Sequence, residues 1–435
     1  MKKSRYNFVF SLGDGKFIAY NALRNGMALV DQPTAALIQE GGEPLEFNLD
    51  PALLGELKRG GFLLEDDEDE YRILLIRWRR MQFETSTLGL TIAPTLDCNL
   101  ACPYCFETHA NCVMDDATED AIVRFAESYL KHAAKRLHVT WYGGEPMLQP
   151  DRVESLGGKL KTLCESNQAS YSASMVTNGT CMTQGWAKRL SEQNLRSVQI
   201  TLDGFREVHD RMRPSKDGSS SFDRIWECLP YLGDFFDVSI RVNVDRSNVD
   251  RALAFIRSIR EEAWFKPDKY HVYLGYLRKE TASCGCEQDE ILKPGEFHRH
   301  TFEIQRQGVR SGHMEPPYPT FGGGCAATSL QGFVVGPKGD LYKCWNHIGY
   351  EDKSVGNVKE PLVLKGIHAA YLTESFENDE ACRRCRYLPL CMGGCVDMRW
   401  KKVQGERSQN DCSEWKYYLE AALRQYFEYK MNKDS

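Results

Sequence analysis

The stretch Cys98-Asn99-Leu100-Ala101-Cys102-Pro103-Tyr104-Cys105 places three thiols in one short loop, with the spacing C-x3-C-x2-C. A structural zinc site needs four ligands in a closed shell, usually supplied as two separate pairs. Three thiols fit better to a 4Fe-4S cluster in which three irons are anchored and the fourth stays open to coordinate a small molecule. We therefore expect an iron–sulfur cluster at Cys98, Cys102 and Cys105, with a zinc site as the weaker alternative.

The composition is that of a folded protein of two or three domains, with 435 residues, 42% hydrophobic and 27% charged. A net charge of −6 provides no broad basic surface for nucleic acid. The first residues, MKKSRYNFVFSLGDGKF, contain no apolar run long enough for a signal peptide. We expect a cytoplasmic protein that binds neither nucleic acid nor membrane. Because cytosolic thiols stay reduced, its sixteen cysteines indicate metal ligands rather than disulfides.

The loop follows the first of six strand-like runs that alternate with helical patterns, an order typical of parallel βα units. The runs cover residues 90–93, 137–141, 174–177, 198–202, 238–243 and 271–274. In the helix between the first two, Asp116 and Glu119 are placed like a capping box. Six units are fewer than a closed eight-stranded barrel needs, so the pattern predicts a partial barrel with its chemistry at the carboxyl ends of the strands.

Four regions follow from the changes of pattern along the chain. Residues 1–85 predict a small α+β domain, which contains an acidic run at 65–70 that we interpret as a solvated loop. Residues 86–285 carry the βα units, 286–320 form a bridging region, and 321–435 are rich in cysteine and glycine before a final amphipathic helix. The fold class is therefore α/β, with an added domain at each end.

At the cysteine loop, where Tyr104 precedes the third cysteine, the sequence resembles the radical S-adenosylmethionine (SAM) superfamily. The resemblance implies a partial (β/α)6 TIM-like barrel in which SAM chelates the open iron. It also implies that SAM is cleaved to methionine and a 5′-deoxyadenosyl radical, which abstracts a hydrogen from the substrate. A flavodoxin- or ferredoxin-like protein would supply the electron.

Two motifs after the second and third strands resemble SAM-binding segments of this superfamily. Gly143, Gly144, Glu145 and Pro146 look like its GGEP turn, whose glycines allow close approach and whose acceptors bind the ammonium group of SAM. Asn178 lies in a segment that resembles the TNG loop, with an ordinary Asn-Gly turn as the alternative.

Four further residues are expected to contact the cofactor or line its site. By resemblance, Thr201 contacts the ribose of SAM and Arg213 its carboxylate, with Arg211 as the alternative to Arg213. Arg241 and Asn243 share one face of the fifth strand, and polar side chains on an interior strand favour a site over solvent.

A second group of cysteines follows the barrel, with the spacing C-x13-G-x4-C, then C-x2-C-x5-C-x3-C, then a lone cysteine. Four of these thiols could form a zinc ribbon. The whole pattern resembles the SPASM domain, which binds auxiliary 4Fe-4S clusters in radical SAM enzymes that act on peptides and proteins. Its members here are Cys325, Cys344, Cys382, Cys385, Cys391, Cys395 and Cys412.

The resemblance implies two auxiliary clusters, and so three 4Fe-4S clusters in total. Cluster II would take four thiolates, and cluster I only three; the two sets are Cys382, Cys385, Cys391 and Cys412, and Cys325, Cys344 and Cys395. Cluster I then needs Cys284 or Cys286 as a fourth ligand, or it keeps an open iron. The four remaining cysteines lack paired spacing and are interpreted as ordinary thiols: Cys112, Cys164, Cys181 and Cys228.

The resemblance favours a maturase that forms a thioether or carbon–carbon crosslink in a ribosomally made precursor peptide. One alternative is a sulfatase maturase that makes formylglycine. Those enzymes typically carry an aspartate base after the second SPASM cysteine, where this chain has Trp345, although Asp340 or His347 could replace it. A noncatalytic electron-transfer protein is the other alternative, and it would need neither an open iron nor a cofactor pocket.

Overall fold

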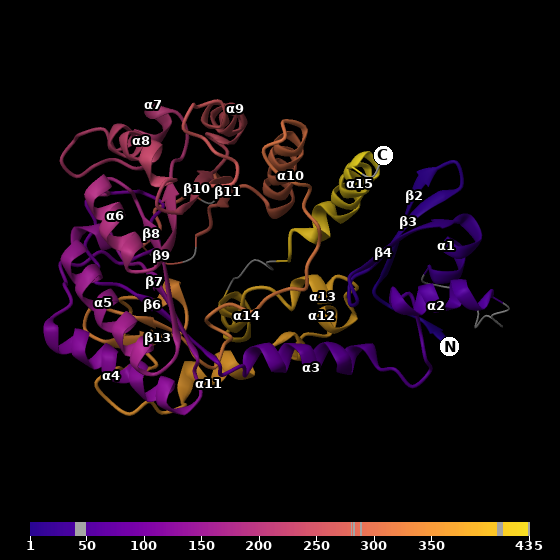
Figure 1. Ribbon diagram of the computed structural model, residues 1–435, viewed down its shortest axis with the longest axis horizontal. Helices are drawn as coiled ribbons and strands as arrows, with labels where there is room; N and C mark the ends of the chain where they lie inside the picture. The colour runs from indigo at the N-terminus through magenta and orange to yellow at the C-terminus, as the bar shows by residue number, and fades with distance from the viewer. Residues whose placement is uncertain (40–48, 280, 282, 288, 407–411, 434–435) are drawn as a thin grey trace. The chain divides into compact units, whose positions relative to one another are not determined.

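The computed structural model describes residues 1–39, 49–279, 281, 283–287, 289–406 and 412–433 (Figure 1). The chain packs into two compact units. The barrel unit comprises Glu84–Ile304 and Ala326–Leu372, and the terminal unit comprises Met1–Phe83, Gln305–Cys325 and Thr373–Ser435. The domain limits proposed from the sequence, at residues 85, 285 and 320, stay a prediction.

The barrel unit is built on parallel strands, and all six predicted strands are present. Neighbouring strands pair in sequence order from β6 to β11, with Thr91 opposite Thr140 in the first pair. Their carboxyl ends therefore meet at one edge of the sheet, which confirms the predicted partial βα barrel. The strands are β6 Thr87–Ile92, β7 Arg136–Trp141, β8 Ser170–Thr177, β9 Leu195–Thr201, β10 Asp237–Val244 and β11 Tyr270–Tyr276.

Three strands from later in the chain extend this sheet at the side of β6. β12 (Gly332–Val335) runs parallel to β6, with Gly332 opposite Gly89. β13 (Asp340–Tyr342) and β14 (Gly356–Asn357) continue it in antiparallel pairs. The sequence analysis ended the sheet at residue 274, because runs of only four, three and two residues give too little pattern to read as strands.

Helices pack against the parallel strands through their apolar faces (Figure 1). In α4, the side chains of Ile122, Phe125, Ala126 and Leu130 are buried in the core, as their helical spacing predicts. The helices of this region are α4 Asp116–His132, α5 Pro150–Ser166, α6 Gln184–Glu192, α7 Arg206–Met212, α8 Ser221–Leu232, α9 Val249–Arg260, α10 Pro294–Arg310 and α11 Gly366–Thr373. Short 3-10 turns lie at η1 Pro146–Leu148, η2 Trp345–His347 and η3 Glu351–Lys353.

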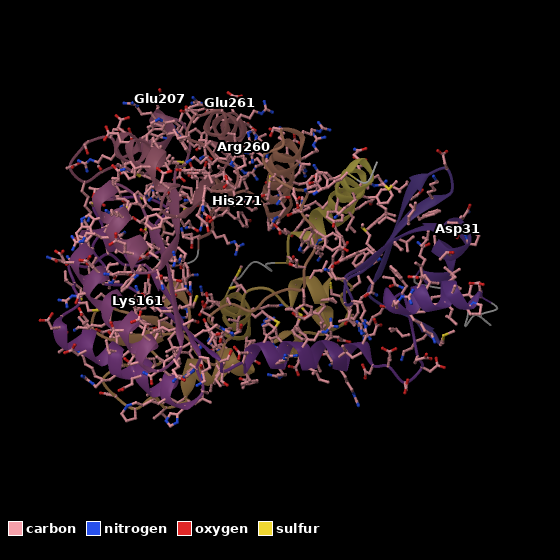
Figure 2. All side chains as sticks on the ribbon, viewed as in Figure 1. Asp31, Lys161, Glu207, Arg260, Glu261 and His271 are labelled. Carbon is pink, nitrogen blue, oxygen red and sulfur yellow. The ribbon has the colours of Figure 1, made fainter. Side chains whose placement is uncertain are left out.

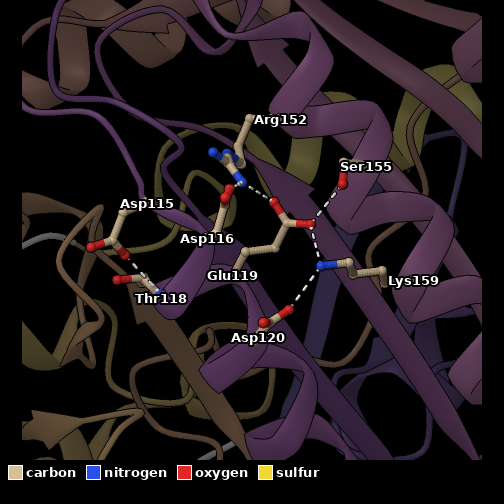
Figure 3. Close-up of polar contacts among 8 residues, drawn as sticks. All are labelled: Asp115, Asp116, Thr118, Glu119, Asp120, Arg152, Ser155 and Lys159. Carbon is tan, nitrogen blue, oxygen red and sulfur yellow. Dashed lines mark hydrogen bonds and ion pairs between the residues drawn. The ribbon is translucent and has the colours of Figure 1, made fainter.

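The predicted capping box at Asp116 and Glu119 is wrong. The N-cap lies one residue earlier than predicted, and the side chain of Glu119 pairs with another helix instead of the cap. Asp115 is the N-cap of α4, and its carboxylate accepts the backbone N–H of Thr118 at 2.8 Å (Figure 3). Glu119 is buried and turns toward α5, where it accepts from Ser155 at 2.7 Å and pairs with Arg152 and Lys159. A cross-helix ion pair outcompetes the local capping contact, because it satisfies a buried carboxylate.

The terminal unit begins with the predicted α+β arrangement. Three antiparallel strands pair in the order β2-β3-β4, and Asp31 caps the following helix by accepting the Thr34 N–H at 2.9 Å (Asp31 is labelled in Figure 2). Hydrogen bonds from Thr34 lower the pKa of Asp31. The elements are β1 Lys2–Lys3, β2 Asn7–Gly13, β3 Lys16–Asn21, β4 Gly26–Asp31, α1 Gln32–Ile38, α2 Pro51–Arg59, β5 Leu63–Leu64 and α3 Glu70–Gln82.

The acidic run at 65–70 is only in part the solvated loop that the sequence predicts. Asp66 is exposed and pairs with the N-terminal ammonium at 2.8 Å. Asp69 is the N-cap of α3, where it accepts the N–H groups of Tyr71 and Arg72. Glu70 is buried and accepts from the Ser4 hydroxyl and the Arg5 N–H. Two of the six acidic residues therefore hold the first strand and α3 in place.

The later part of the terminal unit consists of short helices around cysteines and a long last helix, which confirms the predicted amphipathic helix. Among the residues that the structure describes, no helix in either unit is both long enough and apolar enough to cross a bilayer. The elements are η4 Phe376–Asn378, α12 Glu380–Arg384, α13 Leu388–Cys391, α14 Val396–Val403 and α15 Trp415–Lys433.

Candidate active site

The loop after β6 holds its three cysteines so close together that a negative charge on one sulfur would raise the pKa of another. The amide of Asn178 lies 3.8 Å from the sulfur of Cys98. Burial raises the pKa of Cys98 and of Cys105 to about 12, and it raises the pKa of Cys102 as well. A bound cation would favour the thiolate form of these three neighbouring sulfurs, as a metal or cluster site requires.

A buried hydrogen-bond network lies beside this loop. The hydroxyl of Tyr104 donates to Asp203, and it accepts from Arg213 at 2.7 Å and from the amide of Asn243 at 3.2 Å. The other oxygen of Asp203 accepts the backbone N–H of Asn243 at 2.9 Å. Burial raises the pKa of Asp203, and the charge of Arg213 opposes this shift. The network fixes the aromatic residue of the cysteine loop against the ends of β9 and β10.

The turn after β7 needs both of its glycines. Gly143 has a φ of +111°, and a Cβ there would meet the carbonyl oxygen of Thr95. A Cβ on Gly144 would meet the carbonyl oxygen of Asp97. Side chains at either position would push the turn away from the cysteine loop.

Glu145 connects the same turn to the loop after β8. It is fully buried and accepts from the Thr177 hydroxyl and the Asn178 N–H, both at 2.6 Å, and from the Met147 N–H at 2.9 Å. Three of its lone pairs are therefore used within the protein. Contact between Glu145 and an ammonium group of SAM stays a prediction.

A cavity of about 550 Å³ opens at the carboxyl ends of the strands, in the barrel unit. Nearly all predicted site residues of the barrel line it, whereas Glu145 and Pro146 lie outside its lining and Arg211 is exposed. Those that line it are Cys98, Cys102, Tyr104, Cys105, Gly143, Gly144, Asn178, Thr201, Arg213, Arg241 and Asn243.

The sequence analysis missed an aromatic and acidic part of the cavity wall. The ring of Trp345 lies 4.6 Å from that of Tyr142, and Tyr142 is hydrogen-bonded to Glu107. Burial raises the pKa of Glu107 to about 8. Its Oε2 atom has no hydrogen-bond partner among the described residues. Glu107 follows Cys105 by two residues, so a carboxylate just beyond the motif was the available signal.

The auxiliary cysteines are divided between the two units. In the terminal unit, a negative charge on Cys385 would raise the pKa of both Cys382 and Cys391, and one on Cys412 would raise that of Cys391. The structure therefore brings together the set predicted for cluster II. The ammonium of Lys416 lies 3.6 Å from the sulfur of Cys412. For cluster I, Cys325 and Cys395 belong to the terminal unit and Cys344 to the barrel unit, so this ligand set stays a prediction.

The two other candidate ligands for cluster I lie beside the cysteine loop of the barrel. The sulfur of Cys284 is 2.8 Å from that of Cys286, and the N–H of Gly285 between them donates to the carbonyl of Pro103 at 2.8 Å. Their role as ligands also stays a prediction. Cys164 and Cys228 are buried, as expected of ordinary thiols, and Cys112 and Cys181 are partly buried.

Comparison with known protein families supports an iron–sulfur cluster in this part of the chain. Residues 92–258 match the family model of the radical SAM superfamily. The chain carries a radical SAM domain.

Relatives and solved structures with this domain cover most of the chain. A cysteine-type anaerobic sulfatase-maturating enzyme of Clostridium perfringens (strain 13 / Type A) is 26% identical over 373 residues, which are 79% of this chain and 96% of the relative. A structure of anSMEcpe with bound AdoMet and Cp18Cys peptide has a TM-score of 0.57 at 21% identity and covers 80% of this chain and 98% of its own. The structure of Streptococcus suis SuiB bound to precursor peptide SuiA has a TM-score of 0.54 at 15% identity. The match covers 95% of this chain and 99% of the SuiB chain.

The residues around the cavity fit SAM and a 4Fe-4S cluster. Three thiols stand together in the cysteine loop, and the buried Nε of Arg213 lacks a partner in the part of the chain that the structure describes. A carboxylate is the group that best satisfies such a guanidinium nitrogen. When bound, the cofactor supplies a 5′-deoxyadenosyl radical. In such a complex the three thiols would anchor the cluster, Arg213 would pair with a carboxylate, and the aromatic wall would exclude water.

Proposed function

We propose that this chain is a radical SAM maturase that installs a thioether or carbon–carbon crosslink in a ribosomally made peptide. The observation that carries the proposal is the extent of its likeness to SuiB, a protein solved with its precursor peptide, which covers 95% of this chain. The likeness to anSMEcpe covers 80%. The longer match supports a role of the N-terminal α+β region, residues 1–85, in holding the leader part of a precursor.

The relatives named as sulfatase maturases favour the rival function, which is formylglycine formation. That reaction needs a base beside the substrate, so the residues of the cavity wall help to choose between the two functions. Trp345 occupies the position after Cys344 at which those enzymes typically carry an aspartate. Neither proposed substitute lines the cavity: Asp340 accepts from the amide of Asn357 at 3.0 Å, and His347 lies 3.3 Å from the Tyr371 hydroxyl. At the position after Cys344 an indole ring excludes water but cannot take a proton, so a base for formylglycine formation would have to come from another residue of the wall, such as Glu107.

Crosslink formation removes two hydrogens from the peptide. One hydrogen atom is transferred to the 5′-deoxyadenosyl radical and leaves in 5′-deoxyadenosine. The other leaves as a proton and a separate electron when the new bond forms between the two substrate atoms. The remaining electron needs an acceptor, and auxiliary clusters in the SPASM-like segment could receive it. The proposal therefore includes three 4Fe-4S clusters and an external flavodoxin- or ferredoxin-like donor for the first electron.

The test uses the full chain, reconstituted anaerobically with iron and sulfide, together with SAM, dithionite and peptides encoded beside the gene. The proposal expects 5′-deoxyadenosine and a peptide that has lost two hydrogens and gained a new linkage, which tandem mass spectrometry locates. Formylglycine would instead give an aldehyde that reacts with a hydrazide probe. An aldehyde product on a sulfatase-derived peptide, with no linkage in any precursor, would establish the rival function.

A further inference from the structure

Arg399 lies one helical turn after Cys395 in the terminal unit. Cys395 is the N-cap of α14, and the N–H of Arg399 donates to the carbonyl of Cys395 at 3.2 Å. Residues four apart share a helix face, so the guanidinium projects on the side of the helix where the chain enters from the cysteines.

The segment between Cys391 and Cys395 is shaped around this side chain. Met392, Gly393 and Gly394 all have left-handed backbone conformations, with φ of +50°, +85° and +71°. The Nη1 of Arg399 donates to the carbonyl of Gly393 at 2.8 Å, and a Cβ on Gly393 would collide with that same nitrogen. Only glycine allows both the conformation and the close approach.

Arg399 is partly buried and has one unused donor. Its Nη2 donates to the carbonyl of Glu374 at 3.4 Å, but its buried Nε has no partner within the described parts of the terminal unit. A buried donor on a cation is costly to leave unsatisfied, which indicates that an anion belongs beside it.

The charged groups that act on Arg399 are one carboxylate and three cysteine sulfurs. Its positive charge interacts with Cys382, Cys391 and Cys395, and also with Glu374. In the proposed ligand sets, Cys395 belongs to cluster I, whereas Cys382 and Cys391 belong to cluster II. The sulfur of Cys391 also accepts the backbone N–H groups of Gly393 and Ser413.

We propose that Arg399 is a counter-ion shared by both auxiliary clusters, and that its charge raises the reduction potential of each. The proposal rests on the cluster assignment in the proposed function. Reduction adds one electron to a cluster and neither makes nor breaks a covalent bond. Because the reduced cluster is the more negative form, a fixed cation beside its ligands stabilises it. Arg399 is thus a positioning residue for electron transfer, and it does not touch the substrate.

The test measures potentials and leaves catalysis out. A background with Cys98, Cys102 and Cys105 all changed to Ala removes the SAM-binding cluster, and reconstitution should leave about eight irons per chain in two clusters. Titration with dithionite, followed by electron paramagnetic resonance, then gives two midpoint potentials. Arg399→Gln should shift both to more negative values, and Arg399→Lys, which keeps the charge, should restore most of the shift.

The matched control is Arg384→Gln. Arg384 is 80% exposed and pairs with Glu380 at 2.5 Å, so its loss should leave both potentials unchanged. If Arg399→Gln keeps its iron and both midpoints, the inference is overturned while the cluster assignment stands. A background that binds no iron overturns the assignment and the inference with it. If Arg399→Gln loses iron and Arg399→Lys keeps it, the result supports the need for the positive charge. If both Arg399 variants lose iron, Arg399 has a structural role and the inference is overturned.

Discussion

Arg213 donates to the hydroxyl of Tyr104 at 2.7 Å and keeps its buried Nε unpaired among the residues that the structure describes. This contact is one of several that join the cysteine loop after β6 to the segment after β9, where Tyr104 also packs against Val208 and Met212. Tyr104 precedes the last cysteine of the loop, so the same guanidinium that holds the loop can pair with a carboxylate in the cavity.

Replacing Arg213 by Met should weaken SAM binding roughly tenfold to a hundredfold, because a charge-assisted hydrogen bond contributes about 1.5–3 kcal/mol. Equilibrium dialysis of labelled SAM against the reconstituted enzyme measures the change. Arg211→Met is the control, since Arg211 is exposed on the same short helix and should leave the affinity unchanged. Equal losses in the two variants would contradict the role of Arg213.

Cys102→Ala should remove about four irons per chain and abolish 5′-deoxyadenosine formation, because two thiols no longer anchor the first cluster. Iron analysis and chromatography of the reaction mixture measure the two effects. Cys228→Ala offers a comparison at a buried thiol outside the proposed ligand sets, and it should keep its iron and activity. A Cys102→Ala protein that still cleaves SAM would refute the site.

Gly143→Ala should destabilise the turn by roughly 2 kcal/mol or more, because a positive φ and a backbone collision both oppose the added methyl group. Calorimetry should show a lower unfolding temperature, and SAM binding should fall with it. Gly158→Ala provides the opposite case: it lies within α5, where the nearest atom to an added Cβ is 3.9 Å away. That change should be neutral or slightly stabilising.

Glu119→Gln should lower the free energy of unfolding by about 1–3 kcal/mol at neutral pH, since it weakens the pairs with Arg152 and Lys159 seen in Figure 3. Burial acts to raise the pKa of Glu119, but hydrogen bonds from Arg152, Ser155 and Lys159 outweigh it, and the pKa is lowered. The stabilisation is therefore present above the carboxyl's unfolded pKa of about 4.3 and is lost as the pH falls through the lower folded value.

Unfolding measured between neutral and acidic pH checks this sign. The gap between the parent and Glu119→Gln should narrow as the pH falls below about 4. Asp120→Asn is the matched change at an exposed partner of Lys159 and should cost much less. A gap that widens at low pH would contradict the assigned direction of the pKa.

The sequence predicted the parallel strands and most of the cavity lining because both depend on local patterns. The spacing of Cys98, Cys102 and Cys105 is set within one loop, and Asn178 and Thr201 follow strands that alternate clearly. Glu107 escaped notice although it follows the cysteine loop directly, and Trp345 was noted only for the aspartate that it replaces, because its contact with Tyr142 depends on packing between distant segments. The prediction for the N-terminus of α4 was wrong for a similar reason, because Glu119 pairs with residues on another helix.

The pairing of Gly332 with Gly89 has a consequence for biosynthesis. After β6 is made, the ribosome must translate up to Gly332 before β12, the strand that covers the edge of β6, begins to form. Trp345 emerges later still. Until then the nascent barrel exposes an unpaired edge beside its cysteines, where it can aggregate or bind stray iron. Chaperones should therefore meet this chain early, while the edge is unpaired, and cluster delivery should follow once the C-terminal segments have emerged.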